Sequence, residues 1–224
     1  MSIRLRPQVH YVDLVTDFLE HSMRDNASTI TLVVCTTRDD FVQQIYASIE
    51  LQSTDASNDD IHGTQSTTTH SLLANTIGSI VSSNRIKLAF CPSLEHLRAY
   101  LSVFRGYTGG PPFSAAKEGR YQGQPVLTIL NIVALHYHTG ELSAQGLSRT
   151  LALAVEVAAR EMVKLGVCEC AALREGEAAS GSSVWDADIP LLNSSIDTST
   201  EENRSRPTRT VKVKQVAQRW FDFC

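Results

Sequence analysis

The chain has 224 residues, of which 42% are apolar and 20% are charged, and its formal net charge is -4. This length is enough for one α/β domain with a full hydrophobic core, and the composition is that of an ordinary globular protein. The net negative charge argues against a protein that binds nucleic acid over its whole surface, so any such binding has to be local.

The sequence also argues against a membrane protein and against a disulfide-stabilised one. No apolar run approaches the ~18 residues of a membrane span, and no apolar stretch of the signal-peptide type follows the charged N-terminal segment. The cysteines, at positions 35, 91, 168, 170 and 224, are odd in number and scattered, which indicates reduced, buried thiols. We expect Cys168 and Cys170 to point to opposite faces of a strand and to hold no metal.

The first third of the chain predicts a helix, a strand and a second helix. Apolar residues recur at helical spacing over residues 9–23, and residues 29–35 form a β-branched strand. A helix with Phe41 and Ile45 on its apolar face follows over residues 36–51.

Polar, flexible segments flank the next strand and helix. Residues 52–78 are rich in Ser, Thr, Asp, Asn and His, and paired glycines and prolines occur in residues 106–123, so we expect a flexible loop in each place. Between them lies a strand over residues 86–90, after which Pro92 opens a helix that extends to Phe104.

The apolar run at residues 126–135 predicts the central strand, because a run that is apolar on both faces is typical of a covered parallel sheet. The spacing of apolar residues then changes to three and four, which indicates an amphipathic helix from Leu147 to Leu165, and a strand follows at 167–173. Residues 174–209 form a third polar, flexible segment. Residues 210–223 combine helical spacing with a terminal aromatic pair that suits a strand.

One short segment is close in letters to a known family. Gly140-Glu141-Leu142-Ser143-Ala144-Gln145 follows the central strand, and it resembles the GELSARQ segment that follows the Walker B strand of the eukaryotic RecA-like recombinases and their paralogues. The order of elements is similar over residues 29–171. The resemblance implies a single domain over residues 1–224 with a RecA-like α/β core, in which a mostly parallel sheet is flanked by helices.

The residues that bind ATP in that family are missing. A phosphate loop of the form G-x-x-x-x-G-K-[ST] occurs nowhere, and the segment before the first predicted helix is too short for both a strand and such a loop. Asn131 stands at the degenerate Walker B position, where the family has a magnesium-linked aspartate. We therefore expect a core without its P-loop element, no cofactor and no enzyme activity.

Other catalytic arrangements are weak. His136 and His138 have no third metal ligand at a fixed spacing, so we expect a capping or solvent-exposed role. Glu141 has lost the lysine and aspartate that accompany it in the family, and we expect it to stabilise the start of the next helix. Ser148 lies within a helix and not at a strand-to-helix turn, which excludes a nucleophile elbow.

The C-terminal region carries a basic cluster in an otherwise acidic protein, with no acid from its first to its last member: Arg204, Arg206, Arg209, Lys212, Lys214 and Arg219. Such a run is either a solvated surface or a set of phosphate contacts. It coincides with the position of the family's second DNA-binding loop, and this resemblance favours DNA.

The resemblance implies a Walker-less RecA-like paralogue of the kind found in the Shu complex. Such a subunit pairs with another RecA-like subunit in the nucleus, or also in the cytoplasm, binds single-stranded or forked DNA, and assists recombinase filaments in homologous recombination. Two alternatives stay open. One is a RecA-like subunit of the Elongator accessory subcomplex that acts in transfer RNA modification, and the other is an active nucleotide-binding enzyme with an unrecognised phosphate loop.

Overall fold

A parallel β-sheet forms the centre of the protein, with the strand order β3-β2-β4-β5-β1-β8. The computed structural model describes residues 6–25, 27–58, 70–74, 76–106, 123–137, 139–171, 181–192 and 209–223. The strands are β1 (Gln8–His10), β2 (Ile30–Val34), β3 (Ile86–Phe90), β4 (Val126–Leu130), β5 (Lys164–Cys168) and β8 (Asp222–Phe223). All neighbouring strands in this sheet are parallel.

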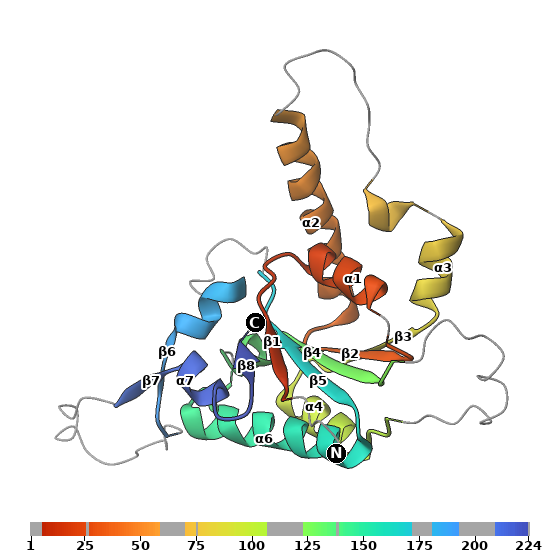
Figure 1. Cartoon of the computed structure of the whole chain (residues 1–224). Coiled ribbons are helices and arrows are strands. Elements are labelled where there is room, and N and C mark those ends of the chain that lie inside the picture. Colours follow the sequence, from red (N-terminus) through yellow and green to blue (C-terminus); the bar gives the residue numbers. More distant parts are fainter. Residues whose placement is uncertain are drawn as a thin grey trace.

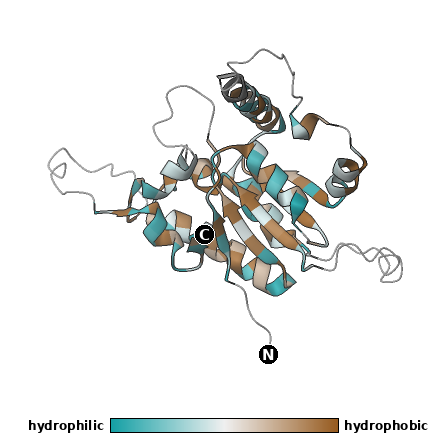
Figure 2. Cartoon of the chain, turned by 45° about the horizontal axis from the view of Figure 1, so that its top comes forward, coloured by the Kyte–Doolittle hydropathy of each residue, from teal (hydrophilic) through white to brown (hydrophobic). Residues whose placement is uncertain are grey.

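Helices cover both faces of the sheet (Figure 1). One face carries α1 (Val15–Arg24), α2 (Arg38–Asn58) and α3 (Ile77–Ser83), and the other carries α4 (Leu94–Val103) and α6 (Ala144–Glu161). Apolar residues concentrate in the strands between these layers (Figure 2). The predicted α/β class, a parallel sheet flanked by helices, is therefore confirmed and is consistent with a RecA-like core. None of the described helices combines the length and the apolar character that crossing a membrane requires.

The central apolar run divides into a strand and a helix, so the predicted strand at 126–135 is too long. The strand β4 ends at Leu130, and α5 (Ile132–Tyr137) begins two residues later, directly after Asn131. Asn131 makes the break with a left-handed φ of 63°, and its backbone N–H donates to the Cys168 carbonyl at 2.8 Å. The sequence misses this break because a run that is apolar on all sides does not distinguish a buried strand from a buried helix.

The following amphipathic helix is confirmed, with a shorter C-terminal end. Ser143 caps α6, since its Oγ accepts the Gly146 N–H at 3.0 Å. The helix ends where Met162 adopts a left-handed φ of 53°. Leu165, expected on the helical stripe, lies in β5, because the parallel pairing of β5 with β4 begins at Lys164.

The sheet has a first strand that the sequence analysis did not expect. Gln8–His10 form β1 between β5 and β8, and Val9 is paired with Val167 and with Phe223. Two neighbouring strands stabilise this three-residue segment and keep Val9 fully buried. The expected helix at residues 9–23 therefore begins at Val15, and the N-terminal segment holds a strand without a phosphate loop.

Parts of the segments that were predicted as loops form helices and strands in the structure. A 3-10 helix (Gly181–Asp186) leads to β6 (Asp188–Pro190), which pairs antiparallel with β7 (Thr210–Lys212) in a ribbon, and α7 (Val213–Ala217) follows. The predicted helix and terminal strand are both present. Likewise, α2 extends to Asn58, and the 3-10 helix Ser71–Leu73 lies in the predicted loop 52–78. The rest of the predicted loops falls outside the described residues, except for their short flanking ends.

Candidate functional site

The carboxyl edge of the sheet beside β1 is the place where parallel α/β proteins commonly bind their ligands. Here the turn from β1 to α1 has only residues 11–14, with neither glycine nor lysine. The Asp13 carbonyl accepts the Ala171 N–H at 2.8 Å, and the Asp13 carboxylate accepts the Ser182 N–H at 2.9 Å. The Gln44 side chain donates to the Ala171 carbonyl at 2.8 Å. The chain itself therefore occupies this turn, which offers no cradle for phosphates.

Gly181 shows how closely the chain packs at this turn. Its φ is 65°, and a Cβ atom at this position would lie 2.9 Å from Oδ1 of Asp13. An L side chain rarely adopts this φ and would also collide with the carboxylate. The contact between the 3-10 helix and the β1–α1 turn thus depends on glycine.

Asn131, the degenerate Walker B position, holds two strand ends together. Its Oδ1 accepts the Cys170 N–H at 2.9 Å, while its backbone N–H bonds to the Cys168 carbonyl. The side chain is buried and directed to the end of β5. Asn131 therefore has a structural role at the β4–α5 break.

Glu169 is a buried acid at the same edge, and the sequence analysis did not single it out. Its carboxylate accepts the N–H groups of Val133 at 2.7 Å and Ala134 at 3.2 Å, at the start of α5. Burial raises the pKa of Glu169 to about 8, although these backbone hydrogen bonds act to lower it. The sequence signal that could have identified Glu169 is its position as a single acid between Cys168 and Cys170 in an apolar run.

The cysteines near Glu169 behave as buried thiols. Sγ of Cys168 and Sγ of Cys170 lie 3.7 Å apart, so the expectation of opposite faces is wrong, because side chains two positions apart lie on one face of an extended chain. Burial raises the pKa of Cys35, and a hydrogen bond between the Cys170 and Cys168 thiols together with burial raises that of Cys170. Such thiols are unreactive. Within the described residues, no group of three or more His, Cys, Asp and Glu side chains is placed to hold a metal.

His136 and Glu141 belong to a polar junction between α4 and α6. The Arg98 guanidinium donates to both oxygens of the Glu141 carboxylate at 2.9 and 2.5 Å and to Thr150 Oγ1 at 3.3 Å. His136 is buried, with its ring nitrogens near the Glu141 carbonyl and Thr150 Oγ1. The expected helix-start role thus falls to Ser143 and not to Glu141, and His136 is neither a cap nor exposed. His138 lies outside the described residues.

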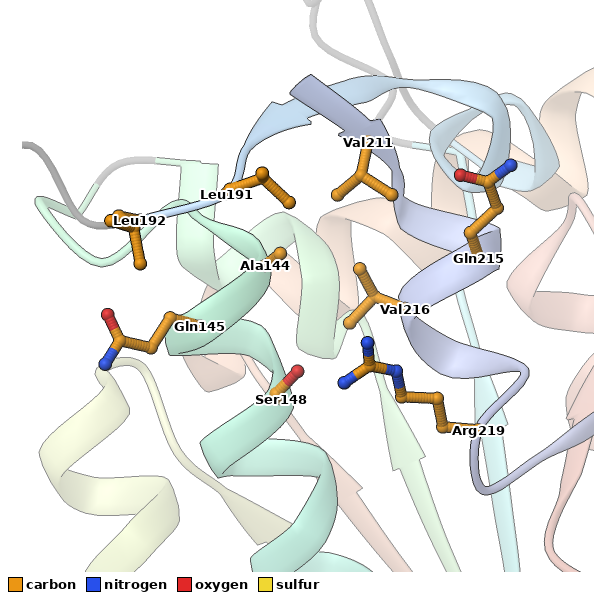
Figure 3. Close-up of a pocket in the computed structure, with 9 residues that line it drawn as sticks. All are labelled: Ala144, Gln145, Ser148, Leu191, Leu192, Val211, Gln215, Val216 and Arg219. Atoms are coloured by element: carbon orange, nitrogen blue, oxygen red, sulfur yellow. The ribbon is translucent and has the colours of Figure 1, made fainter. Parts of the chain in front are cut away.

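An open groove of about 560 Å³ lies between α6, α7 and the β6–β7 ribbon. Figure 3 shows the residues that line it: Ala144, Gln145, Ser148, Leu191, Leu192, Val211, Gln215, Val216 and Arg219. It joins two regions that the sequence analysis singled out separately, because Ala144 and Gln145 end the GELSAQ segment and Arg219 ends the basic cluster. No local pattern in the sequence indicates that these two regions meet.

The structure separates the members of the basic cluster that it describes. Arg209 is exposed beside the ribbon. Lys212 donates to the Asp186 carbonyl at 2.8 Å and lies 3.7 Å from the Asp188 carboxylate. Arg204 and Arg206 fall outside the described residues.

The other two basic residues face elsewhere. The Lys214 ammonium lies over the Tyr11 and Phe223 rings, at 5.6 and 5.2 Å from their centroids, and a hydrogen bond with the Tyr11 side chain raises its pKa. Arg219 lines the groove, where its guanidinium points back towards Val216 and Ser148 (Figure 3). The cluster is therefore not one continuous surface.

The strand order, the two helical layers and the occupied β1–α1 turn define the protein as an α/β protein, consistent with a RecA-like core, whose sequence has no phosphate loop. The chain belongs to the SPAC22G7.03-like family, whose model matches residues 7–223. A search of curated proteins found no match for it.

Proposed function

We propose that the protein is a non-catalytic RecA-like subunit of a DNA-repair complex, which binds DNA and assists recombinase filament assembly in homologous recombination. The observation that carries this proposal is the occupied turn between β1 and α1, where Asp13 bonds to Ala171 and Ser182 in place of a phosphate loop. A RecA-like core that lacks this loop acts through its surfaces, by binding partners and nucleic acid.

An exposed apolar surface on the β3 side supports a partner subunit. The strand β3 is at the edge of the sheet, and its Leu88 side chain is exposed. The nearby helix α3 has no buried residue, and its Ile77 is 84% exposed. Apolar side chains of this kind beside an open strand edge favour coverage by another subunit. We propose a second RecA-like subunit as the partner. The strand β2 is interior, so β3 is the edge strand on this side of the sheet.

The first test is nucleotide binding. We expect the purified protein to show neither tight ATP binding by calorimetry nor magnesium-dependent ATP hydrolysis, because the β1–α1 turn has no lysine and packs against Ala171 and Ser182. Replacing Asn131 with aspartate is expected to restore neither property, since this side chain is directed to the end of β5. ATPase activity that disappears in Asn131→Ala or Glu141→Gln would contradict the proposal.

The second test is the salt dependence of DNA binding. We assign the phosphate contacts to four residues of the basic cluster: Arg204, Arg206, Arg209 and Lys212. The other two are left out because Lys214 lies over the Tyr11 ring and Arg219 lines the groove. Replacing all four with alanine is expected to lower the magnitude of the slope of log affinity against log salt by about 3, at about 0.7 for each contact with a single strand. Fluorescence anisotropy with oligo(dT) at several salt concentrations measures this slope.

A matched variant controls for net charge. It replaces four exposed basic residues on other elements with alanine: Arg38, Lys87, Arg105 and Lys164. We expect it to keep the wild-type slope. Equal slopes for both variants and the wild type would assign the basic cluster to a solvated surface.

The mass of the native complex distinguishes the two proposed assemblies. A heterodimer would fit the DNA-repair subunit, whereas a hexameric ring that binds transfer RNA would support the Elongator-type alternative.

A further inference from the structure

We propose that the groove between α6, α7 and the β6–β7 ribbon binds a short acidic and aliphatic peptide segment of a partner protein. In this arrangement a carboxylate of the peptide pairs with Arg219, and its aliphatic side chains pack on Leu191 and Leu192. This inference goes beyond the proposed DNA-repair function and does not depend on it.

The shape of the groove suits a short segment of chain. Its volume of about 560 Å³ lies within the ~300 to 1,000 Å³ that is common for ligand sites. Its walls come from the first turns of α6, from the ribbon and from α7 (Figure 3). The ribbon wall is fixed to α6, because the Gln145 N–H donates to the Leu191 carbonyl at 3.1 Å. An open groove with a fixed wall accommodates an extended peptide without rearrangement.

Charge determines which kind of peptide fits. Among the residues that the structure describes, Arg219 is the one charged residue in the lining, and it has no hydrogen bond or ion pair with any of the others. The described acids of β6 and β8 are engaged elsewhere: Asp188 lies 3.7 Å from Lys212, and Asp222 bonds to Arg6 at 2.8 Å. A guanidinium in these surroundings is best paired by a carboxylate, which it binds with two parallel hydrogen bonds.

The remaining lining favours a peptide over a nucleic acid. Leu192 is 68% exposed, and Leu191, Val211 and Val216 line the groove with it, so aliphatic side chains find an apolar contact. None of the described residues that line the groove is aromatic, and single-stranded nucleic acids depend on aromatic rings for base stacking. Gln145 lies at the Leu192 end and Ser148 faces Arg219 (Figure 3). Their amide and hydroxyl groups are suited to the peptide backbone.

The test uses the full chain and a fluorescein-labelled peptide, Gly-Ser-Leu-Asp-Leu-Leu-Ser-Gly amide, in fluorescence anisotropy. We expect saturable binding, and we expect the peptide with Asn in place of Asp to bind about tenfold more weakly, as the loss of a charge-assisted hydrogen bond implies. Arg219→Gln is expected to reduce affinity by a similar factor. Leu192→Ser is expected to reduce it about threefold to tenfold, because it removes exposed apolar contact area.

Matched variants control for surface changes that are unrelated to the groove. Arg38→Gln removes an exposed arginine of α2, and Ile77→Ser removes an exposed apolar side chain of α3. Both are expected to keep wild-type peptide affinity. In heteronuclear NMR spectra, the peptide is expected to shift the side-chain amide signals of Gln145, and not those of Gln43 on α2, which is exposed.

Two outcomes would overturn this inference. One is the absence of saturable binding up to about 1 mM peptide, the concentration at which weak specific sites saturate. The other is an Arg219→Gln variant with unchanged peptide affinity but weakened oligo(dT) binding, which would assign Arg219 to nucleic acid. Peptide binding in a protein that binds no DNA would support the inference while contradicting the proposed DNA-repair function, so the two failures are distinguishable.

Discussion

Replacing Glu169 with glutamine is expected to flatten the dependence of the unfolding free energy on pH between about 6.5 and 8. Burial raises the pKa of Glu169 from 4.5 to about 8 in the folded state. A carboxyl group with a raised pKa stabilises the fold fully below its unfolded value of 4.5, and this stabilisation is lost as the pH rises through 8. The Glu169 contribution to wild-type stability is therefore expected to fall by about 1.5 kcal/mol between pH 6.5 and 8, at up to about 1.4 kcal/mol per pH unit.

Urea unfolding at several pH values measures this effect in both proteins. Below pH 6.5 two histidines also affect the measured stability, in the direction opposite to Glu169. Burial lowers the pKa of His10 and of His136 from 6.5, and this makes stability rise with pH. Above pH 6.5 the histidine contributions fade and are the same in both proteins, so they cancel in the comparison, and burial raises the pKa of the Cys35 and Cys91 thiols above their usual value. An equal slope in wild type and Glu169→Gln between pH 6.5 and 8 would mean that Glu169 is already ionised in the folded protein.

Replacing Arg85 with alanine is expected to lower the free energy of unfolding by about 3 to 5 kcal/mol. The buried guanidinium donates to the carbonyl groups of Met23 at 3.0 Å, Asp25 at 3.0 Å and Ala27 at 2.6 Å. These bonds connect the start of β3 to the α1–β2 turn. Charge-assisted hydrogen bonds contribute about 1.5 to 3 kcal/mol each, and their loss leaves three carbonyl groups with weakened pairing, although the contributions are not additive.

The comparison uses equilibrium urea unfolding, with Arg105→Ala as the control. Arg105 is an exposed arginine that lies 3.4 Å from Glu161, so its replacement is expected to change stability by less than about 1 kcal/mol. Arg85→Lys is expected to fall between the two, because one ammonium group cannot reach all three carbonyl groups in the guanidinium geometry. A loss of under about 1 kcal/mol in Arg85→Ala would show that water replaces the guanidinium without cost.

The sequence by itself determined the elements whose pattern is local. The β-branched strand β2 and the helices α2, α4 and α6 follow from the spacing of their apolar residues, although the structure, and not the sequence analysis, identifies Ser93 and Ser143 as the caps of α4 and α6. The missing phosphate loop is also a property of the sequence alone. These features were predictable because helical and strand periodicity, and a motif with fixed spacing, are all read within a few residues.

Only the tertiary structure decided the elements that depend on distant neighbours. The strand β1 is three residues long and exists because β5 and β8 pair with it on both sides. The break at Asn131 requires the end of β5, which is 37 to 39 residues further along the chain and supplies both hydrogen bonds. No local pattern contains this information, because the stabilising partner is absent from the segment itself.

The candidate groove shows the same division. The sequence indicated a basic residue at Arg219 and a distinctive segment that ends at Gln145, and it assigned the first to DNA and the second to the family resemblance. Both regions line the same groove, and this depends on the packing of α7 against α6 and on the β6–β7 ribbon. Packing also decides the pKa of Glu169, since burial outweighs the hydrogen bonds of its carboxylate. Desolvation and side-chain proximity depend on the whole fold, so neither is encoded at any one position of the chain.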